Sequence, residues 1–171
     1  NGREETTTLC LIPAVREATT LPLIAAGGIG TGEAIFALMA LGAEGVQMGT
    51  RFALTDESSA SDIFKEYCLR LNEGDTKLLL KKLAPTRLVT NSFRDRVEAA
   101  EGRGASAEEL RELLGRGRAK KGIFEGDLEE GELEIGQVAA LFRRRQSVDE
   151  VMKELLEGYR RASDKIRSVG L

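Results

Sequence analysis

The chain has 171 residues, 42% of them apolar, and a net charge of -3, which is enough for one ordinary domain with a packed core. Nothing in this charge balance favours nucleic acid, and no apolar run is long enough for a membrane span. There is no histidine, so a Ser-His-Asp triad or a zinc mechanism cannot come from this chain alone. Cys10 and Cys68 lack CxxC spacing; we expect two reduced, buried thiols, no metal site and a cytoplasmic protein.

The first third of the sequence predicts a helix followed by a strand–helix–strand unit. Apolar spacing indicates a helix over residues 6–15, and residues 21–26 are typical of a parallel strand buried on both faces. Thr31 can cap a second helix that Gly42 stops, and residues 45–48 form a second short strand. Such a βαβ unit implies a parallel sheet.

The middle of the chain has a different character. An amphipathic helix opens at Ser61 or Asp62 and is closed by Gly74, and residues 76–90 contain two β-prone pieces. Ser106 and Glu109 form a capping box for a helix through Leu114. We expect the charged, glycine-rich stretch 115–132 to be a surface loop with one short helical turn.

The last part of the chain is predicted to be helical. Residues 135–137 lead into one helix, and a capping box of Ser147 and Glu150 opens the final one.

Glycine turns follow both strands of the predicted βαβ unit. Gly27–Gly28 ends the first strand, and Gln47–Thr50 ends the second. Glycine lets the backbone approach an anion, amide N–H groups at a following helix can bind it, and Thr50 adds a hydroxyl donor. In (β/α)₈ barrels the last two such loops commonly form a phosphate site. Arg51 could add a positive charge, although an arginine beside a turn more often lies in solvent.

Two other interpretations of the turns are weaker. In the run Gly28–Glu33 a glutamate stands where the third glycine of GxGxxG belongs, and the second strand ends in Gly49–Thr50 rather than in an acidic residue. A dinucleotide-type unit is therefore rejected. The glycines could also be simple tight turns, but two of them at matching strand ends favour a phosphate cradle.

These runs closely resemble the nitronate monooxygenase family, and the FMN-dependent enoyl-ACP reductases share the pattern. The resemblance is strongest in Leu23–Ile29 and Leu41–Phe52. It continues in Gly115–Ala119, Gly126–Asp127 and Gly136–Ala139, and so covers nearly the whole chain.

The resemblance implies an α/β fold, namely the C-terminal part of a TIM (β/α)₈ barrel with an inserted small α+β domain. Leu21–Ala26 and Gly45–Met48 would be strands seven and eight. Residues 1–57 and 135–171 would belong to the FMN-binding barrel part, and residues 58–134 to the small domain. The resemblance assigns FMN binding to Gly27, Gly28, Gln47, Met48, Gly49 and Thr50. It also places Gly136 and Gln137 where the two domains meet over the flavin.

The family's catalytic base is a histidine ending a Gly-Gly-His segment. Here the sequence starts Asn1-Gly2-Arg3, so we expect that histidine just before Asn1 and an incomplete fragment without the base. The implied activity is oxidation of alkyl nitronates with molecular oxygen. The alternative is an NAD(P)H- and FMN-dependent enoyl-ACP reductase. We therefore expect a small-molecule substrate, with O₂ or NAD(P)H as redox partner, and neither nucleic acid nor a membrane.

Overall fold

The computed structural model describes residues 6–169. The predicted histidine position before Asn1, and Asn1–Arg3 themselves, lie outside this range. The described chain forms two separate two-stranded sheets surrounded by helices. In chain order its elements are α1 (Thr8–Ala18), β1 (Ile24–Ala26), α2 (Gly32–Ala40), β2 (Gly45–Gln47), α3 (Thr50–Ala53), α4 (Asp62–Cys68), β3 (Thr76–Leu79), β4 (Thr86–Val89), α5 (Ser92–Gly102), α6 (Ala107–Leu114), a π-helical turn η1 (Lys120–Phe124), a 3₁₀ helix η2 (Gln137–Leu141) and α7 (Val148–Ser168).

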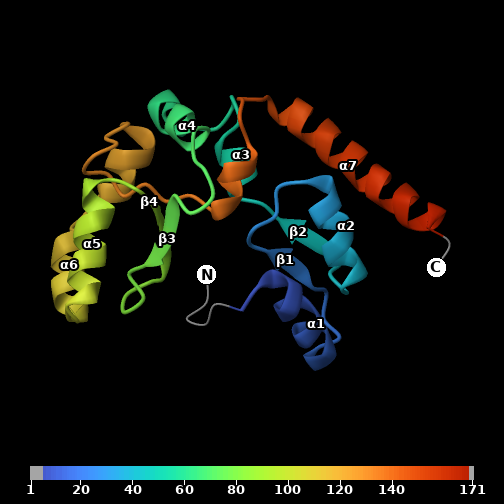
Figure 1. Cartoon of the computed structure of the whole chain (residues 1–171), viewed down its shortest axis with the longest axis horizontal. Helices are drawn as coiled ribbons and strands as arrows, with labels where there is room; N and C mark the ends of the chain where they lie inside the picture. Colours follow the sequence, from blue (N-terminus) through green and yellow to red (C-terminus); the bar gives the residue numbers. More distant parts are fainter. Residues whose placement is uncertain (1–5, 170–171) are drawn as a thin grey trace.

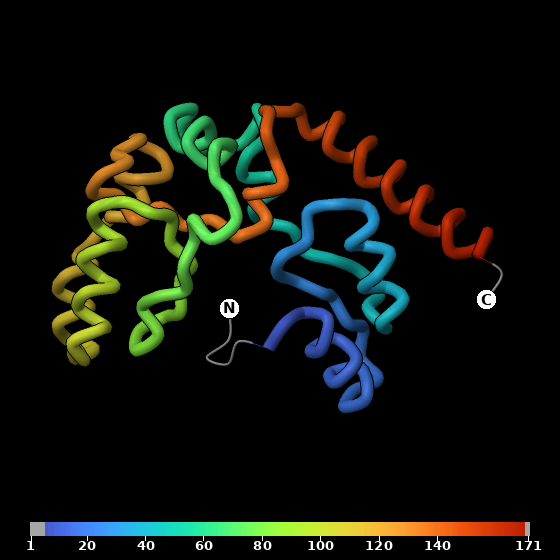
Figure 2. Tube along the Cα trace, viewed as in Figure 1, coloured from blue at the N-terminus to red at the C-terminus, as the bar shows by residue number. Residues whose placement is uncertain are grey.

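The molecule has two lobes joined at one end (Figure 1). One lobe holds α1, β1, α2, β2 and α7, and the other holds the β3–β4 hairpin with α5 and α6. Figure 2 shows that the chain crosses to the second lobe after β2 and returns along η2 to α7. The beginning and the end of the described chain therefore share one lobe, which we call the parallel lobe. The lobe of β3, β4, α5 and α6 is called the hairpin lobe.

The parallel lobe contains the predicted βαβ unit. β1 and β2 pair in parallel, with Ile24 opposite Gly45 and Ala26 opposite Gln47, and α2 connects them. The Thr31 hydroxyl caps α2 by accepting a hydrogen bond of 3.2 Å from the Ala34 amide. These strand–helix–strand predictions are confirmed.

The first strand is shorter and more exposed than predicted. Only Ile24–Ala26 is regular, and its side chains alternate between exposed, buried and exposed. Ala25 packs in the lobe's core, but Ile24 is 55% exposed. The prediction of a strand buried on both faces is therefore wrong within the described residues, because β2 is the strand's sheet partner there and α1 and α2 leave one face open.

The hairpin lobe is built from local pairings. β3 and β4 are antiparallel, with Thr76 opposite Val89 and Leu79 opposite Thr86, as the β-prone pieces of residues 76–90 suggested. The capping box of α6 is present, with Ser106 and Glu109 each bonding the other's backbone. Helix α5 packs on the sheet through its buried residues Phe93, Val97 and Ala100.

Helix α5 was not predicted from the sequence. Its signals are nevertheless present, because Asn91 caps it by accepting a 2.8 Å hydrogen bond from the Arg94 amide. The buried Phe93, Val97 and Ala100 also recur at helical spacing. The charged residues between them give the segment a polar composition, and this masked the pattern.

A third core joins the lobes and crosses the predicted domain boundaries. It includes Leu54 and Phe142 from the proposed barrel part, and Phe64 and Leu133 from the proposed small domain. Helix α4 contributes to this core and ends at Cys68, earlier than the predicted stop at Gly74. Packing is thus continuous across residues 57/58 and 134/135.

Helix α7 lies against α2 at a point of very close backbone approach. A Cβ built on Gly32 would lie 2.1 Å from the Leu155 carbonyl oxygen and 2.2 Å from the Tyr159 amide nitrogen. The predicted capping box of Ser147 and Glu150 starts α7. Glycine at position 32 is therefore required for this crossing.

Two further predictions can be checked. Both cysteines are free thiols; Cys68 is buried, but Cys10 is exposed, so the expectation of two buried thiols is wrong for Cys10. Cys10 lies on α1, where neighbouring Leu9 and Leu11 are exposed as well. Among residues 6–169, no helix combines the length and the apolar character needed to cross a membrane.

Candidate functional site

The two glycine turns leave the sheet at the same edge. Because β1 and β2 are parallel and Ala26 pairs with Gln47, the residues that follow each strand emerge side by side. Gly27–Gly28 follows β1, and Met48–Gly49 follows β2. The structure thus brings together the two turns that were separated by about twenty residues in the sequence, as expected for successive parallel strands.

The first turn adopts a backbone that favours glycine. Gly27 has φ +97° and Gly28 has φ +71°, both in the left-handed region. A Cβ built on Gly28 would meet no atom within 4 Å, so the turn faces open space. On its other side, the Thr8 hydroxyl donates a 3.0 Å hydrogen bond to the Gly27 carbonyl, which ties the turn to α1.

The second turn offers two kinds of hydrogen-bond donor, namely the backbone N–H groups around Gly49 and the Thr50 hydroxyl. Gln47 and Gly49 are exposed, and a Cβ on Gly49 would meet nothing within 4 Å. Met48 is half-buried and packs against the core of the parallel lobe. Helix α3 has four residues, so any helix dipole at Thr50 is small, and the local N–H and O–H groups are the relevant donors.

Thr50 also contacts the third predicted segment. Its Oγ1 accepts a 2.9 Å hydrogen bond from the Gly136 amide, and a hydroxyl that accepts one bond can still donate another. A Cβ on Gly136 would lie 2.6 Å from Thr50 Oγ1, so glycine is needed there. Gln137 begins η2 and is exposed. Residues 86 positions apart are thereby brought into direct contact.

Arg51 is not the solvated residue that its position beside a turn suggested. It is 5% exposed, and its guanidinium is bonded to Gln146 and Glu154, both distant in sequence. Sequence reasoning missed this role, because the partners come from the segment that returns to the parallel lobe. The only local signal was an arginine in a run of apolar residues.

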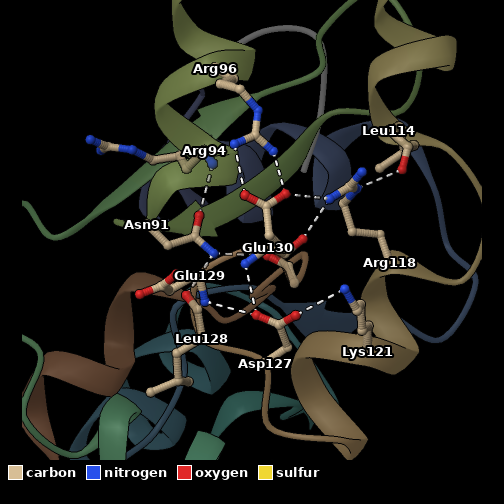
Figure 3. Close-up of polar contacts among 11 residues, drawn as sticks. Asn91, Arg94, Arg96, Leu114, Arg118, Lys121, Asp127, Leu128, Glu129 and Glu130 are labelled. Carbon is tan, nitrogen blue, oxygen red and sulfur yellow. Dashed lines mark hydrogen bonds and ion pairs between the residues drawn. The ribbon is translucent and has the colours of Figure 1, made fainter.

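The glycine-rich segment 115–132 is anchored by specific contacts of several of its side chains (Figure 3). Arg118 donates to the Leu114 carbonyl at 2.8 Å and to the Glu130 carbonyl at 2.6 Å, and its guanidinium lies 4.5 Å from the centre of the Phe93 ring. Arg96 holds the Glu130 carboxylate with two hydrogen bonds. These contacts depress the pKa of Glu130, chiefly through the hydrogen bond from Arg96.

A second carboxylate fixes the same segment. Asp127 accepts the amides of Glu129 and Glu130, and Lys121 forms an ion pair with it at 3.0 Å. The pKa of Asp127 is lowered, first by the Glu130 amide and then by Lys121. The contacts of Arg118 and Glu130 with Phe93 and Arg96 hold the segment against α5.

A parallel βαβ unit with an open glycine turn after each strand belongs to the class of α/β proteins that place ligand sites at the carboxyl ends of their strands. Sequence comparison gives a specific assignment within that class. A profile of the nitronate monooxygenase family matches residues 1–158. The chain therefore belongs to the nitronate monooxygenase family.

Individual relatives agree with this assignment. A probable nitronate monooxygenase of Staphylococcus aureus (strain JH9) is 39% identical over 98 residues, which are 56% of this chain and 27% of the relative. FabK of Thermotoga maritima is 33% identical with a TM-score of 0.89, over 97% of this chain and 53% of that one. Nitroalkane oxidase of Streptomyces ansochromogenes is 30% identical with a TM-score of 0.76, over 93% and 45%.

The α/β fold is thus shared with FabK and nitroalkane oxidase, and the chain spans about half the length of these structures. It covers about a quarter of the curated relative. The described residues form part of such a fold, with one parallel pair of strands and one antiparallel pair.

Proposed function

We propose that this chain carries the FMN-phosphate site of a flavin-dependent oxidoreductase that oxidises alkyl nitronates with molecular oxygen. The observation that carries the proposal is the side-by-side placement of two open glycine turns at the ends of paired parallel strands, in a member of the nitronate monooxygenase family.

The residues at the turns fit a phosphate. A dianionic phosphate needs several donors and close backbone approach. Positive φ at Gly27 and Gly28, and open space over Gly28 and Gly49, allow that approach. Thr50 can donate its hydroxyl hydrogen while its oxygen accepts the Gly136 amide. We assign Gln47 and Met48 to the same site as the residues that lead into the second turn.

The placement of the turns separates the role of FMN from the roles of the chain's own residues. Bound FMN would supply the electron transfer from substrate to oxygen. The chain's own residues bind and orient the phosphate end, and exposed Gln137 is proposed to lie where the lobes meet over the flavin. The chain contains no histidine, so we propose that the catalytic base is supplied from outside these 171 residues.

We also propose the domain division that the family resemblance implies. Residues 1–57 and 135–171 would form the FMN-binding barrel part, in which β1 and β2 serve as strands seven and eight. Residues 58–134 would form the small domain. The separate core of the hairpin lobe supports this division. The core shared by Leu54, Phe64 and Phe142 would then be the interface between the two parts.

The proposal is tested with the natural full-length protein. We expect FMN to bind more tightly than riboflavin, which lacks the phosphate, by at least about tenfold, because charge-assisted hydrogen bonds contribute about 1.5–3 kcal/mol. Anaerobic mixing with an alkyl nitronate should bleach the flavin absorbance near its visible maximum, and admission of oxygen should restore it. An unchanged flavin spectrum after anaerobic mixing would refute nitronate oxidation.

The alternative is an enoyl-ACP reductase that uses FMN and NAD(P)H. It rests on the same turns, whose sequence the FMN-dependent enoyl-ACP reductases share. The enoyl reductase domain of MlnA from Bacillus amyloliquefaciens also has a similar fold, but at 15% identity this likeness shows the fold alone. NAD(P)H oxidation that depends on a crotonyl thioester, without flavin bleaching by a nitronate, would decide for this alternative.

A further inference from the structure

One aromatic side chain, Phe142, lies beside the segments that follow the two glycine turns. The Phe142 ring comes so close to Gly30, which follows the first turn, that a Cβ built on Gly30 would lie 2.6 Å from its Cζ. On its face, 4.3 Å from the ring centre, lies the guanidinium of Arg51, which directly follows the second turn. Phe142 is 6% exposed, so the ring is buried next to both segments.

Arg51 fastens this arrangement to the segment that returns from the hairpin lobe. Its Nη2 donates to Gln146 Oε1 at 2.9 Å and to Glu154 Oε2 at 2.7 Å. Gln146 in turn donates to the same Glu154 oxygen at 2.8 Å. The residue after Thr50 is thereby fixed to α7, the helix that also packs on the start of α2.

The first turn is held by the same segment. Helix α2 begins at Gly32, soon after the first turn, and a Cβ on Gly32 would overlap the α7 backbone at Leu155 and Tyr159. The Arg161 side chain also reaches Glu33 at 3.2 Å. Residues 138–161 thus contact the segments that follow both turns, in addition to the strand pairing that places the turns side by side.

Stability of the fold alone does not explain why residue 51 is an arginine. The Nε–H of Arg51 is buried and finds no hydrogen-bond partner among residues 6–169, which costs free energy of folding. A well-packed apolar side chain would avoid that cost. What an apolar side chain could not supply is the combination of a planar face for Phe142 and a charged donor for Gln146 and Glu154.

We propose that Arg51, stacked on Phe142, is a positioning residue that holds Thr50 in place relative to the first phosphate-binding turn. This inference rests on the proposed FMN site. Arg51 does not contact the ligand; it acts by fixing Thr50 relative to Gly28. Loss of Arg51 would therefore weaken recognition of the phosphate and leave binding of the isoalloxazine ring unchanged.

The test compares FMN and riboflavin binding in the natural full-length protein and in three variants. Arg51→Met removes the charge and the planar group at similar length, and Arg51→Lys restores the charge without the planar fork. Arg145→Met is the matched control, because Arg145 lies in the same returning segment but bonds Asp56 and Asp62, away from the turns. Dissociation constants are measured by quenching of flavin fluorescence.

We expect Arg51→Met to weaken FMN binding by about tenfold and riboflavin binding by less than about twofold, since a displaced donor loses most of its hydrogen-bond energy. Arg51→Lys should recover part of the loss, and Arg145→Met should behave as the natural protein. If Arg51→Met does not fold, the test rests on Arg51→Lys, which should weaken FMN binding more than riboflavin binding.

Two results would overturn the inference. Equal loss of FMN and riboflavin binding would show a general structural role for Arg51, and no loss of either would show no role. The proposed function fails in a different way. If the natural protein itself does not prefer FMN to riboflavin, the phosphate site is wrong before any variant is compared.

Discussion

The two lobes bury their apolar side chains to different degrees and by different strand pairings. In the hairpin lobe, neighbouring strands pair with each other and neighbouring helices cover them, so Phe93, Val97 and Leu110 are completely buried. In the parallel lobe, helix α2 lies between the two paired strands in the sequence. Large apolar side chains such as Ile24 and Leu21 are 55% and 70% exposed there. The comparison shows that local antiparallel pairing completes a core within few residues, whereas a parallel pair needs neighbours on further edges.

The proposed FMN site lies in the parallel lobe. Both open glycine turns lie at the edge of the parallel pair, and their positions depend on α7 and on the segment before it. That segment is attached to the hairpin lobe through residues 133–135, which pair with β4. We therefore expect substitutions in the hairpin lobe to act mainly on stability, and substitutions at the α2–α7 crossing to act on the site as well.

The largest expected effect is in the core of the hairpin lobe. Phe93→Ala should lower the free energy of unfolding by about 3–5 kcal/mol, because it removes a completely buried ring and leaves a cavity. It also removes the surface on which Arg118 lies. Urea unfolding monitored by circular dichroism measures the loss. Phe124→Ala is the control, since Phe124 is 51% exposed and its loss should change stability little. Equal effects of the two changes would contradict the self-contained hairpin core.

The next effect is at the crossing of α2 and α7. Gly32→Ala should cost about 1–3 kcal/mol or more, because its Cβ would overlap backbone atoms of Leu155 and Tyr159, which cannot move independently of α7. FMN affinity should fall with it. The control is Gly102→Ala, at an exposed helix end with open space around it, which should be neutral or stabilise by about 0.5 kcal/mol. A stable Gly32→Ala protein would show that α7 is free to shift.

The smallest effect concerns acid. The pKa of Glu154 is lowered, first by the hydrogen bond from Gln146 and also by Arg51 and Arg144. A carboxyl group with a lowered folded pKa stabilises the fold above its unfolded pKa, and this contribution is lost as the pH falls through the folded value. Below about pH 4.3, the usual glutamate pKa, the contribution should therefore decline.

This acid effect can be isolated by substitution. The difference in thermal unfolding midpoint between the natural protein and Glu154→Gln should shrink from pH 6 to pH 3, because the natural side chain becomes neutral too. Glu130→Gln provides the comparison in the hairpin lobe, where Arg96 lowers the pKa of Glu130 in the same direction. Of these two carboxylates, only Glu154 should affect FMN affinity. A parallel loss of FMN affinity in Glu130→Gln would contradict the separation of the lobes.

Local signals in the sequence were sufficient for most elements. The βαβ unit, the hairpin strands and both capping boxes were predicted correctly, since apolar periodicity and the capping residues act within a few positions. Helix α5 could have been predicted from Asn91 and the spacing of its buried residues. The exposure of Ile24 could not have been predicted, because the sequence of an apolar strand does not show whether neighbouring elements cover it.

The sequence by itself determined which residues make the turns: glycines at positions 27, 28 and 49, with a hydroxyl at Thr50, following short strands. Only the tertiary structure decided what holds these turns in place. Gly136 reaches Thr50 across 86 positions, and Glu154 reaches Arg51 across 103. The physical reason is that backbone conformation is set locally, by sterics and nearby hydrogen bonds. The partner of a buried charge is instead set by how distant helices pack, and no short stretch of sequence records it.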